Sequence, residues 1–572
     1  MNTREALNKP AQTSPIRLCS IVAVLFIAGA SIANAADADK PGHAAIASAH
    51  KLATDAGFEV LAQGGNAFDA AAAVAAALSV VEPQSSGIGG GGLFLLHRAS
   101  DSKNVMVDAR ETAPASVDAK DYLDANGKLD QDKSWNGPSA AAIPGEPAGI
   151  VWMAQHYGRL PLAKSLAPAI RIAREGFQPD ARFIEAVGER LEVIKRFPGS
   201  AALYLDDGAP PKAGWTFKNP DLAKTLELIA AKGNEGFYHG EMAKRVVDGV
   251  NAVGGKWTLK DLADYQAKER EPLTFDHHGW QIITAPPPSS GGIVLAEMLN
   301  ILNGYDFAKL DKVQRTHFTV EAMRRAYRDR AAYLGDPDFV KMPIARLTGA
   351  AYADELRKTI QADKATPSAS LPGYMDAGER TETSHFSIID AEGNFVGGTQ
   401  TVNLSLGDAL VIPGTGFVMN NEMDDFALKA GAPNAFGLVG NDANAPKAGR
   451  RPLSSMTPTF VIGKDSIAVI GTPGGSRIIT MVLEGVLAFI DGQLPAQIVA
   501  NPRFHHQYLP DVISAEKGAF TKDETKALEK IGHVVNEANR PWGFMNVVSM
   551  DRKTGKLYSA SDSRRSGSGE VR

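Results

Sequence analysis

A predicted β-hairpin in the C-terminal third of the chain is the strongest constraint on the fold. Residues Phe386 to Ile389 alternate like a strand, and Asp390-Ala391-Glu392-Gly393-Asn394 has the composition of a turn. Residues Phe395 to Asn403 would form the return strand, with Gly397-Gly398 as a candidate bulge. We therefore expect this part of the chain to lie in an antiparallel sheet.

The register of this hairpin decides which side chains meet at its open end. If Asp390 pairs with Phe395, Thr383 lies opposite Val402 and is flanked by a hydroxyl and an amide side chain; a bulge would shift this register by one residue. Both neighbours can form hydrogen bonds with the Thr383 hydroxyl. The segment alone is also compatible with an ordinary hairpin that has a threonine on its solvent face.

Thr383 is a candidate nucleophile if cleavage of the Glu382–Thr383 bond makes it an N-terminal residue. A threonine hydroxyl inside a chain is a weak nucleophile. At an N-terminus it has its own base, the α-amine, whose pKa is ordinarily about 7.7–8.0. We therefore expect the chain to be a self-cleaving precursor.

Several motifs share a fixed order with Thr383-Ser384-His385. Those downstream are Asn420 to Phe426, Arg451 to Pro458, Gly471 to Arg477 and Asn501 to Gln507. Those upstream are Val81-Glu82-Pro83, Ser86 to Gly92, Arg110 to Ala115 and Gly335 to Phe339. Taken together, these motifs closely resemble the γ-glutamyltransferase family of N-terminal nucleophile hydrolases.

The resemblance implies roles for eleven positions. Thr383 matches the family's nucleophile, the Glu382–Thr383 bond its autoprocessing site, and Thr401 a hydroxyl partner of the nucleophile. The other positions match groups that bind substrate: Asn403, Glu422 and Asp425 at the α-amino end, Arg110, Ser454 and Ser455 at the α-carboxylate, and Gly474 and Gly475 as the backbone N–H pair of the oxyanion hole.

These residue types suit a γ-glutamyl group, which has an ammonium and a carboxylate on one carbon. Arginine can bind a carboxylate through two parallel hydrogen bonds, and a carboxylate can pair with an ammonium. Each charge-assisted hydrogen bond contributes about 1.5–3 kcal/mol. Gly474-Gly475 lies between a strand-like run, Ser466 to Ile470, and a helical pattern from Ile478, so free N–H groups at a helix N-terminus could stabilise an oxyanion.

The resemblance implies a γ-glutamyltransferase that also hydrolyses glutathione and other γ-glutamyl compounds. Thr383 would form a γ-glutamyl ester, which water or an amino acid or dipeptide acceptor would resolve, without a cofactor or a metal. One alternative is a cephalosporin (glutaryl) acylase of the same fold, whose substrate lacks the α-amine. The other is an exported binding protein that keeps the fold without catalysis.

The fold that the resemblance implies is α+β, a four-layer αββα sandwich. A large subunit, residues 36–382, and a small subunit, residues 383–572, would form it together as a heterodimer. The residue patterns by themselves predict only mixed α and β structure. They indicate helices from His50 to Gln63 and from Ala67 to Val80, and two or more helices between Pro161 and Ala267.

Residues 1–35 have the pattern of a signal peptide. Arg17 precedes an apolar run from Leu18 to Ile32, and Ala33-Asn34-Ala35 is a cleavage signal. The run is shorter than the ~20 residues of a spanning helix, so we expect a periplasmic or secreted protein without a stable membrane anchor, with an uncleaved anchor as the alternative. Cys19, the only cysteine, lies in this run, so cleavage would leave no thiol for disulfides, catalysis or metals.

The charge of the chain argues against nucleic acid as a partner. Removing residues 1–35 takes away three basic residues and one acidic residue, and the net charge falls from −5 to −7. A mildly acidic protein is not drawn to nucleic acids or anionic membranes by its charge. The arginines from Arg324 to Arg330 alternate with acidic and apolar residues on a helical pattern, and we expect them on a solvated helix face.

Three motifs are not assigned a function. Gly87 to Gly92 fits a dinucleotide-binding pattern, but a helical segment and not a strand precedes it. The pairs His505-His506 and His277-His278 lack the spacing of metal ligands. Residues 433–447 resemble the family's lid over the glutamyl pocket, with Phe436 where a tyrosine is often found, so a hydroxyl contact there would be missing.

Overall fold

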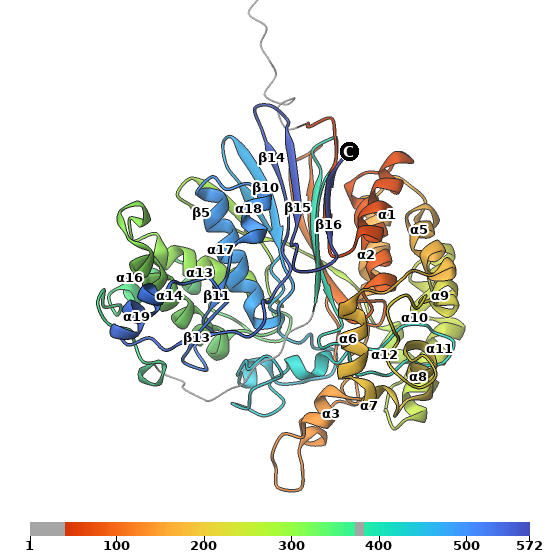
Figure 1. Cartoon of the computed structure of the whole chain (residues 1–572). Coiled ribbons are helices and arrows are strands. Elements are labelled where there is room, and N and C mark those ends of the chain that lie inside the picture. Colours follow the sequence, from red (N-terminus) through yellow and green to blue (C-terminus); the bar gives the residue numbers. More distant parts are fainter. Residues whose placement is uncertain (1–39, 372–382) are drawn as a thin grey trace, which may run out of the picture. The chain divides into compact units, whose positions relative to one another are not determined.

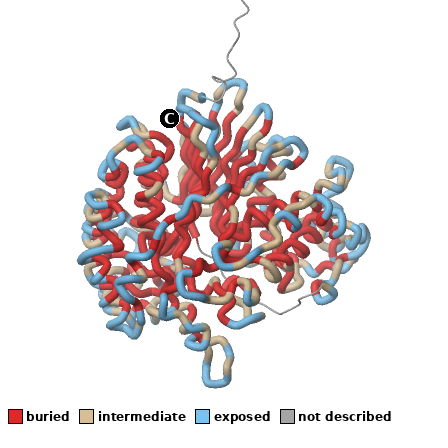
Figure 2. Tube along the Cα trace, turned by 180° about the vertical axis from the view of Figure 1, so that it is seen from behind, coloured by how far each residue is buried: buried red, intermediate tan, exposed pale blue. Residues whose placement is uncertain are grey.

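Two β-sheets face each other at the centre of the protein, and helices cover the outer face of each (Figure 1). The computed structural model describes residues 40–371 and 383–572. The predicted signal peptide and Glu382 lie outside the described residues. The predicted α+β fold, a four-layer αββα sandwich, is confirmed, and Figure 2 shows that buried residues follow both sheets and the inner helix faces.

The seven-stranded sheet contains the predicted hairpin. Its order is β16 (Ser568–Val571), β1 (Ala45–Ser48), β7 (Ser384–Ile389), β8 (Phe395–Thr401), β2 (Gly91–Arg98), β3 (Lys103–Ala109) and β4 (Lys268–Arg270). All neighbours in it are antiparallel. Every residue of β7 and β8 is buried, because helices cover one face of these strands and the second sheet covers the other.

The six-stranded sheet packs against β1, β7 and β8. Its order is β15 (Leu557–Ser561), β14 (Asn546–Asp551), β10 (Ser466–Gly471), β9 (Thr459–Ile462), β6 (Trp280–Thr284) and β5 (Leu273–His277). A small third sheet consists of β11 (Phe504–His505), β12 (Ile513–Ala515) and β13 (Val535–Glu537).

The two helical layers surround separate apolar cores. On the seven-stranded side lie α1 (Lys51–Ala62), α2 (Ala67–Val81), α4 (Glu146–His156), α5 (Leu162–Glu175) and α9 (Pro220–Lys232). On the six-stranded side lie α13 (Gly291–Leu302), α14 (Lys312–Tyr333) and α17 (Ile478–Ile490). The predicted helices α1 and α2 are confirmed; α2 is buried along its whole length, because its alanines allow neighbours to approach from all sides.

Further α-helices complete the described part of the structure. They are α3 (Gln131–Trp135), α6 (Ala181–Glu189), α7 (Leu191–Ile194), α8 (Pro198–Tyr204), α10 (Glu235–Tyr238), α11 (Gly240–Ala252), α12 (Leu259–Ala263), α15 (Ile344–Leu347), α16 (Ala350–Arg357), α18 (Pro495–Ala500) and α19 (Lys522–Lys530). Within residues 40–371 and 383–572, no helix is both long enough and apolar enough to cross a membrane.

The predicted register of the hairpin is wrong by one residue. The ladder pairs Ser384 with Gln400 and Ile389 with Phe395, and its continuation places Thr383 opposite Thr401. The reason is the Asp390 side chain, whose Oδ1 accepts the N–H of Asn394 at 2.9 Å and so closes a five-residue turn. Asp390 therefore belongs to the turn and not to the last strand pair.

The predicted bulge at Gly397-Gly398 is also wrong. Both glycines lie in the regular ladder, opposite Ser387 and Phe386. A Cβ atom on Gly398 would lie 2.2 Å from the Phe386 ring. Glycine is needed there because an aromatic ring covers the backbone, and not because the strand bends.

The arginines of α14 are not on a solvated face as expected. Arg324, Arg325 and Arg330 are 5% exposed or less. Arg325 Nη1 pairs with Glu321 Oε2 at 2.5 Å, and Arg324 pairs with Asp511. The alternation of charges in the sequence reflects ion pairs inside the protein, since α14 is covered by the segments that follow it.

Candidate active site

Thr383 lies at the start of a central strand, beside Thr401, one of the two side chains expected to meet it. It directly precedes β7 and is 4% exposed. The Thr383 hydroxyl donates a hydrogen bond to Thr401 Oγ1 at 3.4 Å. Thr401 Oγ1 also accepts a hydrogen bond from the backbone N–H of Asn403 at 2.7 Å. The Asn403 side chain donates to the carbonyl oxygen of Asn421 at 2.8 Å, which links the end of β8 to the acidic turn that begins at Glu422.

The glycine-rich segment before β2 allows the backbone around Thr401 to pack closely. A Cβ atom on Gly90 would lie 1.9 Å from the carbonyl oxygen of Thr401, and one on Gly89 would lie 2.0 Å from that of Val418. The segment follows α2 and precedes β2, as expected, which excludes the dinucleotide-binding pattern. The glycine-rich segment therefore holds the end of β8 in place. This packing role was not predicted from the sequence motif.

His385 is not suited to act as the catalytic base. Burial lowers the pKa of its imidazole to about 3, so the ring is neutral at ordinary pH. Its two nitrogens lie 2.8 Å from Thr399 Oγ1 and 3.1 Å from Ser387 Oγ. The ring packs against Gly471, where a Cβ atom would lie 2.1 Å from it, so His385 brings the end of β10 close to the start of β7.

Arg110 forms a buried ion-pair cluster with the two predicted ammonium-binding residues. Its Nη1 lies 2.6 Å from Glu422 Oε2, and its Nη2 lies 2.5 Å from Asp425 Oδ2. A third carboxylate, Glu111, lies 3.3 Å from Nη1, and Nε donates to the carbonyl oxygen of Pro452 at 3.2 Å. The structure thus places one cation and several carboxylates at a single point, as recognition of an amino-acid zwitterion requires.

Burial and ion pairing compete within this cluster. Burial raises the pKa of Glu111 to about 7, against the lowering effect of Arg110. Burial also raises the pKa of Glu422 well above its ordinary value, again against Arg110. The Arg110 pKa is lowered by burial but raised overall by the neighbouring carboxylates, so Arg110 keeps its charge.

The neighbouring acidic residue, Asp424, anchors the predicted lid. Its Oδ2 accepts the N–H of Ala435 at 2.8 Å, and Asn434 Nδ2 donates to Asp425 Oδ1 at 3.0 Å. Phe436 in this segment packs on Gly475, where a Cβ atom would lie 2.4 Å from the ring. Segment 433–447 therefore contacts both the acidic turn and the glycine pair.

Ser454 and Ser455 lie in a buried loop that pairs with residues 286–290. The Ser454 N–H donates to the carbonyl oxygen of Pro288 at 2.9 Å, and the Ser455 Oγ lies 3.4 Å from Arg330 Nη2. Arg330 also donates to Ser290 Oγ at 3.0 Å. Sequence reasoning missed Arg330 as a neighbour of Ser455; unlike Arg324 and Arg325, which pair with Glu321 of the same helix, Arg330 contacts serines outside α14.

Gly474 and Gly475 form the turn between β10 and α17, as expected. Their φ angles are 145° and 55°, both in the region that favours glycine. Gly475 begins a short 3₁₀ turn that leads into α17, so N–H groups are available at this helix start. The turn follows Gly471, which contacts His385 two residues after Thr383, so the turn begins close to the strand that Thr383 precedes.

One group among the described residues has the spacing of a metal site. His317, Glu321 and His533 are buried and lie close together. His317 Nε2 donates to the carbonyl oxygen of Gln361 at 2.7 Å, and His317 Nδ1 lies 2.8 Å from His533 Nε2. Glu321 pairs with Arg325 at 2.5 Å. Because these hydrogen bonds and ion pairs use the potential ligand atoms, we assign the group a structural role.

The sandwich, with a threonine at the start of a central strand, is that of N-terminal nucleophile hydrolases. The crystal structure of a cephalosporin acylase from Bacillus halodurans matches this chain with a TM-score of 0.82 and 29% identity, covering 92% of this chain and 95% of that one. The family described as gamma-glutamyltranspeptidase matches residues 53–571. The chain therefore belongs to the gamma-glutamyltranspeptidase family.

Two curated relatives agree with this assignment. A glutathione hydrolase proenzyme of Escherichia coli is 42% identical over 526 residues, which cover 91% of this chain and 90% of the relative. A glutathione hydrolase proenzyme of Pseudomonas aeruginosa is 39% identical over 558 residues, which cover 96% of this chain and 98% of the relative.

Proposed function

We propose that this protein is a self-processing glutathione hydrolase and γ-glutamyltransferase. The observation that carries the proposal is the buried cluster of Arg110 with Glu422 and Asp425. A γ-glutamyl group brings a carboxylate for Arg110 and an ammonium for the two acids, so it can replace each internal ion pair with one to the substrate. The two proenzyme relatives support the same activity.

In the first half-reaction, the Thr383 hydroxyl attacks the carbonyl carbon of the γ-amide. The α-amine of Thr383 accepts the hydroxyl proton and returns it to the departing amine. The N–H groups of Gly474 and Gly475 stabilise the oxyanion. Thr401 holds the Thr383 hydroxyl through the hydrogen bond described above. Because His385 is neutral and already hydrogen-bonded, the α-amine is the better base.

In the second half-reaction, water or an amino group attacks the γ-glutamyl ester on Thr383. The attacking water or amine loses a proton to the α-amine of Thr383. The C–Oγ bond then breaks, and Thr383 Oγ regains its hydrogen from the α-amine. Hydrolysis releases glutamate, and transfer to an amino acid or dipeptide releases a new γ-glutamyl compound. The chemistry needs no cofactor.

Formation of the nucleophile requires cleavage between Glu382 and Thr383. The products are a large subunit, residues 36–382 after loss of a signal peptide, and a small subunit, residues 383–572. The proenzyme names of the two relatives support processing, and the A-x-A signal supports export to the periplasm or the medium.

The acylase alternative has a similar fold but a different substrate. A glutaryl group has no ammonium, so Glu422 and Asp425 would have no positively charged partner on the substrate. We expect kcat/KM for a γ-glutamyl anilide to exceed that for a glutaryl anilide by more than about a hundredfold, because an unpaired buried carboxylate costs ~3 kcal/mol.

The test compares both anilides in the wild type, in Asp425→Ala and in Asp442→Ala. Asp425→Ala should raise KM for the γ-glutamyl anilide and leave glutaryl hydrolysis unchanged or faster. Asp442, an exposed aspartate in the same lid, serves as the matched control and should leave both substrates unaffected. Comparable kcat/KM for the two anilides in the wild type would favour the acylase, and no turnover of either would favour a binding protein.

A further inference from the structure

The motif Val81-Glu82-Pro83 contains a buried acid that the proposed mechanism does not use. Glu82 caps the C-terminus of α2 and is 3% exposed. A carboxylate is disfavoured in an apolar interior, and also at a helix C-terminus, where the last carbonyl groups concentrate negative charge. Stability alone therefore does not explain a carboxyl group at this position.

A chain of hydrogen bonds ends on the Glu82 carboxyl. Gln400 Nε2 donates to Ser86 Oγ at 3.1 Å, and Ser86 Oγ donates to Ser384 Oγ at 3.2 Å. Ser384 Oγ then donates to Glu82 Oε2 at 3.4 Å. The other carboxyl oxygen, Oε1, accepts a hydrogen bond from Gln84 Nε2 at 3.3 Å. Glu82 is therefore the acceptor at both of its oxygens.

The turn after α2 contacts both strands of the hairpin that carries the nucleophile. Ser384, the donor to Glu82, directly follows Thr383 at the start of β7. On the other strand, the backbone N–H of Val402 donates to the carbonyl oxygen of Ser85 at 3.3 Å. Val402 directly follows Thr401, so this turn holds the residue after each of the two threonines.

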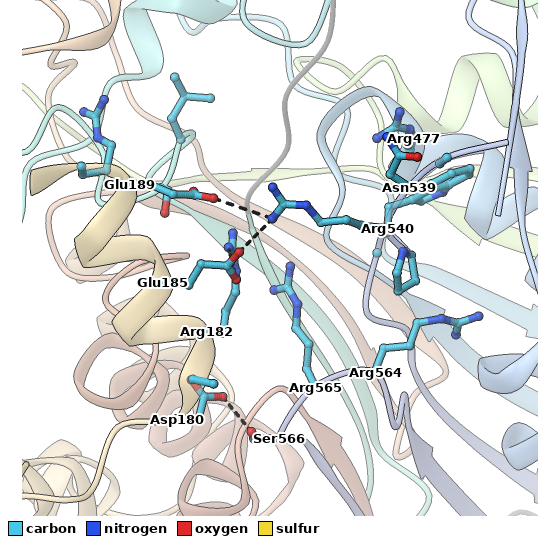
Figure 3. A pocket seen from close by; sticks show the side chains of 18 residues that line it. Asp180, Arg182, Glu185, Glu189, Arg477, Asn539, Arg540, Arg564, Arg565 and Ser566 are labelled. Carbon is cyan, nitrogen blue, oxygen red and sulfur yellow. Dashed lines mark hydrogen bonds and ion pairs between the residues drawn. The ribbon is translucent and has the colours of Figure 1, made fainter. Parts of the chain in front are cut away.

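Three charged side chains act on Glu82 from outside this chain of hydrogen bonds. Burial raises the pKa of Glu82 to about 7, the positive charges of Arg565 and Arg182 oppose this shift, and Asp180 adds to it. All three line a pocket of about 980 Å³ beside α6 (Figure 3). The Glu82 carboxyl therefore changes its protonation state near neutral pH.

We propose that Glu82, in its carboxylate form, is a positioning residue for Thr383 and acts through the hydroxyl of Ser384. A carboxylate accepts hydrogen bonds at both oxygens, so Ser384 donates to it and the start of β7 is fixed. A protonated carboxyl has a hydrogen on one oxygen, so one of its two donors loses its acceptor or the chain reverses. Thr383 is then less well oriented toward the carbonyl that it attacks, in self-cleavage and in turnover.

This inference rests on the proposed function, and its first test is a double-mutant cycle. The kcat and KM for a γ-glutamyl anilide are measured in the wild type, in Glu82→Gln, in Ser384→Ala and in the double variant. Each single variant should lower kcat about tenfold and change KM less than about twofold, because orientation of the nucleophile is lost and substrate binding is not. The double variant should lose no more than either single variant, since both interrupt one contact.

Two further variants serve as matched controls. Ser79→Ala removes a buried hydroxyl of α2 that donates to the carbonyl oxygen of Ala75 and not to Glu82. Glu484→Gln removes another acid whose pKa is raised by burial, to about 8, and whose hydrogen-bond partner is Phe504. Both should keep the wild-type kcat.

The second test uses pH, because self-cleavage takes place before Thr383 has a free α-amine. The precursor is made by cell-free synthesis, and its cleavage is followed on gels at pH 6 and pH 8. We expect the ratio of the wild-type rate to the Glu82→Gln rate to fall about fivefold from pH 8 to pH 6, because Glu82 is mostly protonated at pH 6. Glu484→Gln should keep the wild-type pH dependence.

Wild-type kcat in Glu82→Gln would overturn the inference, and so would a ratio of cleavage rates that is the same at both pH values. Losses that multiply in the double variant would also overturn it, since they would show two independent contacts. If Glu82→Gln does not fold, Ser384→Ala decides: wild-type kcat in that variant would overturn the inference. Absence of both self-cleavage and anilide hydrolysis in the wild type would instead contradict the proposed function.

Discussion

At the residue scale, Thr401 is the side chain whose hydroxyl contacts the proposed nucleophile, Thr383. Its oxygen accepts one hydrogen bond from Thr383 and another from the backbone of Asn403. The second bond fixes the position of the oxygen, so that the first can orient the nucleophile. The backbone around Thr401 is held in turn by Gly90, which leaves no room for a side chain.

Thr401→Val should therefore slow self-cleavage and turnover by roughly 10- to 100-fold, because a misplaced nucleophile loses orientation while the valine keeps the shape of the side chain. The rates are measured by following the two fragments on gels and by hydrolysis of a γ-glutamyl anilide. Thr401→Ser keeps the hydroxyl and should retain most of both activities. Wild-type rates in the valine variant would show that this hydroxyl does not act on Thr383.

The site residues that the sequence could identify are those in compact motifs. Arg110, Glu422 and Asp425 were expected to hold opposite ends of one substrate, and the structure brings them together. Arg330 was missed because its environment comes from residues 290 and 455, far from it in sequence. The hairpin register was missed because the Asp390 side chain, and not strand propensity, decides where the turn closes.

At the element scale, α17 combines an apolar helix with one half-buried acid, Glu484, whose Oε2 atom is buried. Glu484 Oε1 accepts the N–H of Phe504 at 3.1 Å, while Oε2 has no hydrogen-bond partner within the described residues. Burial raises the pKa of Glu484 to about 8, against the opposing effect of Arg503. Helix α17 itself was predictable from its apolar pattern, but this buried carboxyl depends on β11, which packs beside it.

The raised pKa of Glu484 predicts a loss of stability at alkaline pH. The folded state holds the proton more tightly than the unfolded state, so this stabilisation is complete below the unfolded pKa and is lost as pH rises through about 8. In a Thr383→Ala background, which keeps one chain, Glu484→Gln should reduce the fall in unfolding free energy between pH 5 and pH 9 by at least about 1.4 kcal/mol.

Urea unfolding at the two pH values measures this difference. Glu529→Gln, at an exposed position on α19, is the control and should keep the pH dependence of the parent. Part of the dependence should remain in Glu484→Gln, because burial also raises the pKa of Glu82 to about 7. An identical pH dependence in Glu484→Gln and its parent would contradict the prediction.

At the scale of the whole molecule, the proposed subunits share both sheets. Strand β1 of the large subunit lies between β16 and β7 of the small subunit, and β8 pairs with β2 across the same boundary. In the second sheet, β9 of the small subunit pairs with β6 of the large one. Single-sequence patterns gave helices and strands but not this interleaving, which depends on pairs hundreds of residues apart.

The two fragments should therefore stay together after cleavage. We expect them to elute as one species in gel filtration and to separate only at urea concentrations that unfold the sheets, because separation breaks strand pairs in both. Thr383→Ala, which lacks the attacking hydroxyl, should remain one chain without activity. Release of either fragment in native buffer, or efficient self-cleavage of the alanine variant, would contradict the assignment.

Because the strands of the two fragments interleave, we expect that the cleaved enzyme cannot refold once it has been denatured. In the precursor, all strand partners belong to one chain. In the cleaved and denatured enzyme, two chains would have to associate, and their unpaired strand edges could aggregate instead. The lifetime of the mature enzyme is then set by how slowly it first opens and not by any balance with refolding. We therefore expect that the proposed cleavage at Thr383 also prevents the denatured enzyme from refolding to its native state.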